Sequence, residues 1–188
     1  MNKVVAVVGM CGSGKSVATD LFVSSGWASV YFGGITLEAV KEKGLPITPD
    51  NERMVREGIR KQYGQAAYAI KLLPSIHDLL QSNNVIVDGL YTWSEYKYLK
   101  EHLKDQLQIL CIISDKRMRY SRLANRPVRP LSNVEAEVRD YAEIERLEKG
   151  GPIAIADVYI VNNSTKEEFE HRIKEYIYTL AEVLDNES

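Results

Sequence analysis

The sequence is poor in cysteine and has no excess of basic charge. Its 188 residues include only Cys11 and Cys111, which are too few for a disulfide framework and form no CxxC pair. We therefore expect two free thiols in a reducing compartment, the cytoplasm. The 24 lysines and arginines are balanced by 26 acidic residues, for a net charge of -2. Broad nucleic-acid binding usually requires a basic excess, so nucleic acid is an unlikely partner.

Long apolar runs are also missing. No segment approaches the roughly 20 residues of a membrane span, so we expect no membrane partner. The amino-terminal run KVVAVVG is too short for a signal peptide and passes into glycines without a cleavage pattern. Hydrophobic residues still make up 45% of the chain. That content suits the core of one domain of ordinary size, spanning residues 1–188.

Strands and helices are expected to alternate along the chain. Apolar, β-branched runs predict strands at 3–8, 27–31, 85–87, 107–113 and 158–161. Between and after them, periodic segments predict helices at 15–25, 36–43, 50–63, 65–81, 93–103, 116–125, 133–149 and 166–184. The alternation predicts an α/β fold of three layers, with helices on both faces of a parallel sheet.

Polar residues and glycines predict where some of these helices begin and end. Asp50 or Asn51 is expected to cap the helix at 50–63, and Asn133 the helix at 133–149. We expect Gly33-Gly34 to turn the chain and Gly150-Gly151-Pro152 to stop a helix.

The stretch GMCGSGKS, which begins at Gly9, fits the phosphate-loop pattern GxxxxGK[ST] between a predicted strand and a predicted helix. Its glycines let backbone N–H groups converge on phosphate oxygens, and the helix N-terminus adds positive charge. Lys15 can reach the β- and γ-phosphates, and the Ser16 hydroxyl can bind Mg²⁺. We therefore predict that ATP is bound by Gly9, Cys11, Gly12, Ser13, Gly14, Lys15, Ser16 and Val17, with Cys11 contributing its backbone.

A second feature is VIVDGLY, in which Asp88 ends an apolar strand. An aspartate at the carboxyl end of a parallel strand lies at the sheet edge beside the phosphate loop. Asp88 is therefore expected to assist Mg²⁺ together with Ser16 or to orient an acceptor hydroxyl. The alternative is a turn-forming Asp-Gly pair.

A third feature is the arginine cluster DKRMRYSRLANRPVRP. Arg119, Arg122 and Arg126 share one face of a predicted helix, and Arg129 follows in an irregular segment. Phosphoryl transfer needs mobile positive charge around the migrating group. We predict a lid over about residues 122–139, in which Arg122, Arg126 and Arg129 touch phosphate. The alternative is a solvated basic helix surface.

The segment EAEVRDYAEIERLEK mixes charges of both signs at helical spacing, which is typical of a solvated face. Arg139 and Asp140 are possible exceptions, because they lie at the far edge of the lid. Arg139 is expected to reach the transferred phosphate when the lid closes.

Taken in order, GMCGSGKS, VIVDG, RxxRLxxR and ADVYIVNN resemble the adenylate-kinase-like small-molecule kinases. The chain is similar to dephospho-CoA kinase and adenylate kinase, and to an archaeal group of nucleotide-kinase-like proteins. The resemblance spans nearly the whole chain and implies a five-stranded parallel sheet in the order 2-3-1-4-5. It also implies an acceptor-binding helical region over about 34–82, a short lid, and Asn162, Asn163 and Ser164 near the nucleotide base.

Two segments of the sequence depart from this family pattern. Related kinases often carry Gly-Asp and then an arginine after strand two, whereas here Gly34 takes the place of the aspartate and Leu37 that of the arginine. The arginine expected shortly after Asp88-Gly89 is also replaced, by LYTW. These departures argue against an ordinary nucleoside monophosphate as the acceptor.

Other residues can take over the roles of these absent side chains. Arg53, Arg56 and Arg60 share one face of a predicted helix and can supply charge to an acceptor, although a solvated face is the alternative. Tyr91 and Trp93 can stack on a base or line an apolar pocket, unless they pack in the core.

These features together predict ATP- and Mg²⁺-dependent phosphoryl transfer to a small nucleotide or nucleotide-like metabolite. The catalytic residues would be Lys15, Asp88, Arg122, Arg126, Arg129 and Arg139. A regulatory GTPase is disfavoured because no NKxD-like guanine motif is present. The alternative is a nucleotide-binding regulatory or partner-binding module that keeps the kinase fold without phosphorylating an acceptor.

Overall fold

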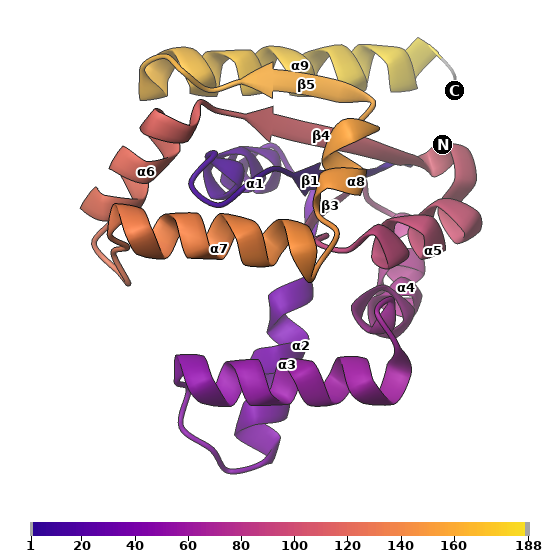
Figure 1. Cartoon of the computed structure of the whole chain (residues 1–188). Coiled ribbons are helices and arrows are strands. Elements are labelled where there is room, and N and C mark those ends of the chain that lie inside the picture. The colour runs from indigo at the N-terminus through magenta and orange to yellow at the C-terminus, as the bar shows by residue number, and fades with distance from the viewer. Residues whose placement is uncertain (1, 187–188) are drawn as a thin grey trace.

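The structure, a computed structural model, describes residues 2–186 and contains one parallel sheet (Figure 1). The strands are β1 (Val4–Val8), β2 (Ala28–Tyr31), β3 (Val85–Asp88), β4 (Leu107–Ile113) and β5 (Val158–Val161). They lie in the order β2-β3-β1-β4-β5, and every pairing is parallel. The predicted strand order and sheet type are therefore confirmed.

Helices surround this sheet. They are α1 (Lys15–Ser24), α2 (Phe32–Glu42), α3 (Pro49–Tyr63), α4 (Ala67–Leu80), α5 (Trp93–Leu103), α6 (Lys116–Asn125), α7 (Asn133–Glu145), α8 (Gly150–Ala154) and α9 (Lys166–Asn186), with a 3₁₀ turn η1 (Lys104–Gln106). Within residues 2–186, none of them is both long and apolar enough to cross a membrane.

Two apolar cores lie on opposite faces of the sheet. Along β1, Val4, Ala6 and Val8 face the core formed with α4 and α5, and Val5 and Val7 face the core formed with α1 and α9. All five side chains are fully buried. A strand covered on both faces reads as a continuous apolar run rather than an alternating one, which is why VVAVV could be identified from the sequence.

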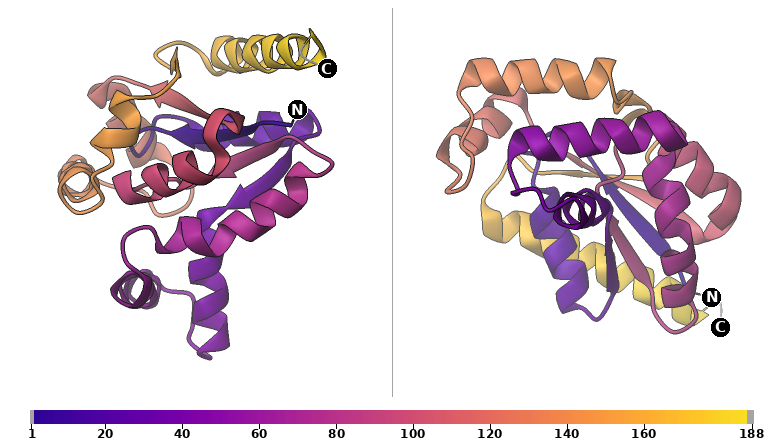
Figure 2. Two further views of the ribbon diagram at one scale, coloured as in Figure 1. Left: turned by 90° about the vertical axis from the view of Figure 1, so that its right-hand side faces the viewer. Right: turned by 90° about the horizontal axis from the view of Figure 1, so that it is seen from below.

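Helices α2 and α3 project beyond the sheet between β2 and α4, as Figure 2 shows from two sides. The N-cap of α3 is Thr48, whose side chain accepts a hydrogen bond from the Asn51 amide, and Pro49 occupies the first turn. The expectation that Asp50 or Asn51 caps this helix was therefore wrong. A proline preset for helical φ, placed directly after a threonine, starts the helix earlier.

Two glycine segments also differ from expectation. Gly33-Gly34 does not turn the chain but lies in the first turn of α2, which starts directly after β2. A Cβ on Gly33 would lie 2.3 Å from the Tyr31 hydroxyl, so glycine lets the Tyr31 ring lie against this turn. The helix expected over 133–149 ends at Glu145 and is capped by Ser132 rather than Asn133, through a capping box with Glu135. The Gly150-Gly151-Pro152 segment then forms part of α8.

Candidate active site

The phosphate loop joins β1 to α1 and depends on its glycines. Gly9, Gly12 and Gly14 have φ values of 139°, 80° and 108°. Residues other than glycine rarely adopt φ values in this range. Space is equally restrictive, because a Cβ on Gly9 would lie 2.4 Å from the Ile112 carbonyl oxygen. A Cβ on Gly14 would lie 2.3 Å from Asn162 Nδ2. Larger residues at these positions would force the loop away from the sheet edge.

Hydrogen-bond donors converge at the start of α1. The first amides of a helix have no partner within the helix, and no side chain of the described residues caps α1 at Gly14. The Ser13 hydroxyl is buried and has no hydrogen-bond partner among the described residues. Amides, a hydroxyl and the positive end of a helix together fit an anion such as a polyphosphate.

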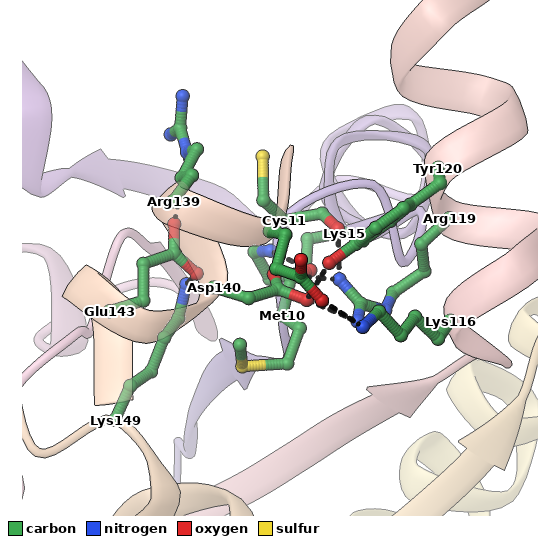
Figure 3. A network of polar contacts seen from close by, with 11 residues as sticks. Met10, Cys11, Lys15, Lys116, Arg119, Tyr120, Arg139, Asp140, Glu143 and Lys149 are labelled. Atoms are coloured by element: carbon green, nitrogen blue, oxygen red, sulfur yellow. Dashed lines mark hydrogen bonds and ion pairs between the residues drawn. The ribbon is translucent and has the colours of Figure 1, made fainter. Parts of the chain in front are cut away.

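Lys15 lies across this loop. Its Nζ donates to the carbonyl oxygens of Gly9 at 2.8 Å and Met10 at 3.0 Å (Figure 3). Burial, and then the nearby charge of Lys149, lower the pKa of Lys15 to about 8, against the opposing influence of Glu143, Cys11 and Asp88. An incoming anion would raise this pKa again, because its negative charge stabilises the protonated lysine.

Asp88 ends β3 and is paired in register with Val7 of β1, next to the phosphate loop. Burial raises the pKa of its carboxyl, although Lys15 counteracts this. The described residues contain no group of three or more His, Cys, Asp or Glu side chains that could hold a metal ion alone. Mg²⁺ would therefore rely on phosphate oxygens, helped by the Ser16 hydroxyl and the Asp88 carboxylate, which are the oxygen ligands it prefers.

The loop after β5 contacts the phosphate loop directly. Asn162 Nδ2 donates to the Ser13 carbonyl oxygen at 2.8 Å. The Arg122 guanidinium donates to Asn162 O at 3.0 Å and to Ser114 Oγ at 3.0 Å. Asn163 Oδ1 accepts from Ser114 Oγ at 3.1 Å. Arg122, expected among the lid arginines, instead lies at this loop with its donors on protein oxygens.

Ser164, the third residue expected near the base, has a buried hydroxyl without a hydrogen-bond partner among the described residues. The loop therefore contains a hydroxyl without a hydrogen-bond partner next to two asparagines whose side chains already form hydrogen bonds.

The other predicted lid arginines reach across to α3 and along α7. Arg126 Nε contacts the Arg129 carbonyl oxygen. Arg129 Nη2 lies 2.9 Å from Glu52 Oε1 of α3, a contact between residues 77 apart in the sequence. Arg139 Nε lies 3.2 Å from Glu143 Oε1, one turn further along α7. In this structure, the segment predicted as a lid therefore touches α3 through Arg129.

An ion pair ties α7 to the phosphate loop. Arg119 of α6 makes two bonds to the Asp140 carboxylate, at 2.9 and 2.7 Å, and Tyr120 donates to the same carboxylate at 3.2 Å. Arg119 also donates to the Cys11 carbonyl oxygen at 3.0 Å (Figure 3). This bond uses the Cys11 backbone, and the Cys11 side chain is in no disulfide with another described residue.

Glu143 and Lys149 form a second ion pair that the sequence did not indicate. Lys149 Nζ lies 2.7 Å from Glu143 Oε2 and 4.7 Å from the centre of the Tyr91 ring. Only 1% of the Lys149 side chain is exposed. Burial alone would raise the pKa of Glu143, but Lys149 and Arg139 hold it below its ordinary value. The expectation of a solvated face was therefore wrong for Glu143, which pairs with Lys149. Asp140, which was named as an exception to that face, is buried against Arg119 of α6.

A cleft of about 870 Å³ opens between α3 and α7. Its walls carry seven arginines and one lysine but only three glutamates. The basic residues are Arg53, Arg56, Arg60, Lys61, Arg126, Arg129, Arg139 and Arg146. Phe32 and three tyrosines, Tyr31, Tyr68 and Tyr91, also line it. A strongly basic cleft with aromatic rings suits a ligand that has both negative charge and a flat ring.

The arginines of α3 differ in how far they are already engaged. Arg60 is mostly buried, lies 3.6 Å from Glu95 and stacks over the Tyr68 ring at 5.3 Å. Arg53 is exposed and pairs with Asp50 at 3.2 Å. Arg56 lines the cleft and has no acidic partner within residues 2–186. Arg56 is therefore the α3 arginine most available to a ligand.

Trp93, for which the sequence left both pocket lining and core packing open, does not line this cleft. Its ring stacks on Tyr96 at 5.1 Å, and a Cβ on Gly151 would lie 2.7 Å from it. Trp93 therefore packs between α5 and α8, whereas Tyr91 lines the cleft as expected.

Sequence comparisons identify the relatives of this chain. A family profile described as an AAA domain matches residues 5–140. A UPF0200 protein from Thermococcus onnurineus is 33% identical over 178 residues, covering 93% of this chain and 96% of that protein. The chain belongs to the UPF0200 family. A second member, from Methanococcus maripaludis, is 29% identical over 180 residues, with 92% and 94% covered.

Solved structures show the same architecture. Dephospho-CoA kinase from Campylobacter jejuni has a TM-score of 0.61 at 18% identity, covering 97% of this chain and 98% of that one. A gluconokinase from Sinorhizobium meliloti has a TM-score of 0.60 at 18% identity, with 99% and 97% covered. The chain therefore has the P-loop kinase fold shared by small-molecule kinases, which confirms the resemblance inferred from its motifs.

Proposed function

We propose that this protein transfers the terminal phosphoryl group of ATP, with Mg²⁺, to a small nucleotide or nucleotide-like metabolite in the cytoplasm. The observation that carries the proposal is that the phosphate loop lies close to an arginine-rich cleft, since Gly89, which follows Asp88, lines that cleft. Glu143 and Tyr91 line the arginine-rich cleft. Lys149, which contacts both of them, also lowers the pKa of Lys15 in the phosphate loop. These contacts support a donor site for polyphosphate beside a basic pocket for a second molecule.

The donor side uses the phosphate loop. Lys15 and the amides from Gly9 to Val17 would hold the β- and γ-phosphates, and Ser16 with Asp88 would support Mg²⁺. When bound, Mg²⁺ supplies positive charge to the phosphate oxygens. Asn162 and Asn163 would border the base, and Arg122, which donates to the Asn162 carbonyl oxygen, would lie at that end of ATP as well.

The acceptor side is the cleft. Its volume of about 870 Å³ lies within the roughly 300–1,000 Å³ of ligand pockets, so it can hold a nucleotide-sized molecule. Arg56 and Arg60 would bind a phosphate that the acceptor already carries, and Tyr31 and Tyr91 would flank its ring. These groups would do the work of the aspartate and arginine that related kinases carry after strand two.

The reaction needs one proton acceptor and mobile positive charge. An acceptor hydroxyl oxygen forms a bond to the γ-phosphorus, the bond from that phosphorus to the β–γ bridging oxygen breaks, and ADP leaves. Where Asp88 orients the acceptor rather than supporting Mg²⁺, the hydroxyl proton would pass to its carboxylate, because burial raises the pKa of this carboxyl and so favours proton uptake. Arg126, Arg129 and Arg139 would neutralise charge on the transferring oxygens.

The test uses γ-labelled ATP with Mg²⁺ and a panel of acceptors. The panel contains nucleoside monophosphates, dephospho-CoA and, as unphosphorylated acids, gluconate and shikimate. We expect transfer to a phosphorylated, ring-containing acceptor, and loss of transfer in Lys15→Met. Turnover that survives in Lys15→Met would reject the assignment, and transfer only to gluconate or shikimate would reject the acceptor class.

A nucleotide-binding module without acceptor chemistry is the second candidate. It is favoured by Leu37, an apolar residue lining the cleft where related kinases carry an arginine. This candidate predicts tight MgATP binding with slow hydrolysis and no transfer to any acceptor in the same panel.

A further inference from the structure

Glu143 holds two cations that differ in how freely they can leave. Lys149 is fully buried and lies 2.7 Å from Glu143 Oε2. Arg139 lies 3.2 Å from Glu143 Oε1, and 48% of its side chain is exposed. Figure 3 shows Glu143 between the two side chains, with Arg139 extending away from Lys149.

Lys149 is anchored, whereas Arg139 is held by a single bond. The Lys149 amide also donates to the Glu143 carbonyl oxygen at 3.2 Å, and its side chain packs over Tyr91. Glu143 and Arg139 line the cleft, but Lys149 is not among the lining residues. An incoming phosphate would therefore meet Arg139 and Glu143 and leave Lys149 behind them.

Burying a lysine is expensive, and a packed apolar side chain would often be at least as stable at such a position. The charge nevertheless has a definite effect on the pair beside it. A carboxylate with one buried partner can release its second partner without being left as an unpaired buried charge. The same carboxylate with Arg139 as its only partner would hold that arginine more strongly.

We propose that Lys149 is a positioning residue that makes Arg139 available, so that Arg139 exchanges the Glu143 carboxylate for the terminal phosphate of ATP. Glu143 occupies the place of that phosphate on Arg139 until nucleotide binds, and Lys149 neutralises Glu143 after the exchange. This inference rests on the proposed function, because it requires Arg139 to bind phosphate.

The exchange predicts effects of opposite sign. Lys149→Met leaves Glu143 with Arg139 alone, so the terminal phosphate must compete with a stronger ion pair. Glu143→Gln removes the competing charge and frees Arg139. We expect the first variant to weaken binding of the terminal phosphate about tenfold and the second to strengthen it severalfold, which is the range of charge-assisted hydrogen bonds.

The experiment measures calorimetric affinities for Mg²⁺-AMP-PNP, a non-hydrolysable ATP analogue, and for Mg²⁺-ADP. The affinity for Mg²⁺-AMP-PNP divided by the affinity for Mg²⁺-ADP gives a ratio that reports the contribution of the terminal phosphate. Both substitutions are made in the wild type and in an Arg139→Met background. Lys116→Met is the matched control, because Lys116 forms a lysine–glutamate pair with Glu137 of the same helix as Glu143 at 2.6 Å, on the surface.

We expect opposite changes in the ratio that disappear in the Arg139→Met background, and no change for Lys116→Met. Changes that persist without Arg139 would mean that the charges of Lys149 and Glu143 act directly on the nucleotide and not through Arg139. That result would overturn the exchange. A ratio unchanged by both substitutions would also overturn it.

Folding is controlled separately. Should Lys149→Met fail to fold, the double variant Glu143→Gln/Lys149→Met leaves no unpaired charge in that pair. Its ratio should be at least that of the wild type, and a lower one would contradict the exchange. If the wild type binds neither nucleotide, the proposed function itself fails; if it binds both but the ratios do not follow this pattern, only the present inference fails.

Discussion

The Asn162 side chain joins the last strand of the sheet to the phosphate loop, since its Nδ2 donates to the Ser13 carbonyl oxygen at 2.8 Å. Its Oδ1 accepts from Arg122 at 3.1 Å, so one amide connects β5, α6 and the loop. The loop is thus held in shape by protein contacts, which is the preorganisation that polyphosphate binding needs.

Asn162→Ala should therefore loosen the loop. Removing the amide leaves the Ser13 carbonyl and the Arg122 guanidinium each without one partner, and we expect a loss of about 1–3 kcal/mol in the free energy of unfolding. MgATP affinity should also fall. Urea denaturation and calorimetry measure the two effects. Asn125→Ala is the control, because the Asn125 side chain makes only an exposed bond within α6 and should change neither.

Asp140→Asn tests the tie between α7 and the loop. It leaves the buried Arg119 guanidinium without its counter-ion, and we expect about 3–5 kcal/mol of destabilisation. Asp50→Asn removes the partner of Arg53 in an exposed pair and should cost about 1 kcal/mol or less. Equal losses in the free energy of unfolding, measured by urea denaturation, would contradict the prediction that the buried pair contributes more than the exposed one.

The pKa of Lys15 predicts a pH dependence. Burial, then Lys149, lowers it to about 8 from its ordinary value of 10.5. Between these values the unfolded chain binds more protons than the folded one, so the contribution of Lys15 makes the folded state more stable as pH rises. Bound polyphosphate favours the charged lysine, and nucleotide affinity should fall as pH rises above 8.

The direct measurement for this prediction is proton uptake. At about pH 9, calorimetry of MgATP binding in two buffers of different ionisation enthalpy should show protons taken up by the complex. Wild type that takes up none would contradict the assignment of Lys15 as a phosphate ligand.

Arg56→Met should weaken binding of the acceptor. Arg56 lines the cleft without an acidic partner among residues 2–186. No carboxylate neutralises its positive charge, so that charge can act fully on an acceptor phosphate. We expect KM for the acceptor identified in the panel to rise about tenfold or more, with little change in KM for ATP. Arg53→Met is the matched comparison on the same helix, and it should have a smaller effect because Arg53 is exposed and paired with Asp50.

The sequence predicted the parts of the site that are local. The phosphate loop from Gly9 to Ser16 is one short segment, and strand burial at β1 and β3 places Asp88 beside it in any parallel sheet of this order. The α/β fold class could be predicted because apolar runs typical of strands alternate with helical segments along the whole chain.

The sequence could not predict contacts between distant segments. Asp140 finds Arg119, 21 residues away, and Glu143 finds Lys149 beyond the end of its own helix. Both acids have the spacing of a solvated helix face. Asp140 is buried by α6, which packs against α7, and Glu143 by Lys149, which follows α7. Likewise, the turn predicted at Gly33 is absent, and nothing local in the sequence shows that the Tyr31 ring lies against this glycine.

The contact between Arg129 and Glu52 has a consequence for which molecules can enter the cleft. It links the loop before α7 to α3, both residues line the cleft, and their Nη2 and Oε1 atoms lie 2.9 Å apart. A neutral sugar would bring no negative charge to replace that of Glu52 on Arg129, whereas an anion would. A cleft bridged in this way would favour anionic ligands over neutral ones of the same shape.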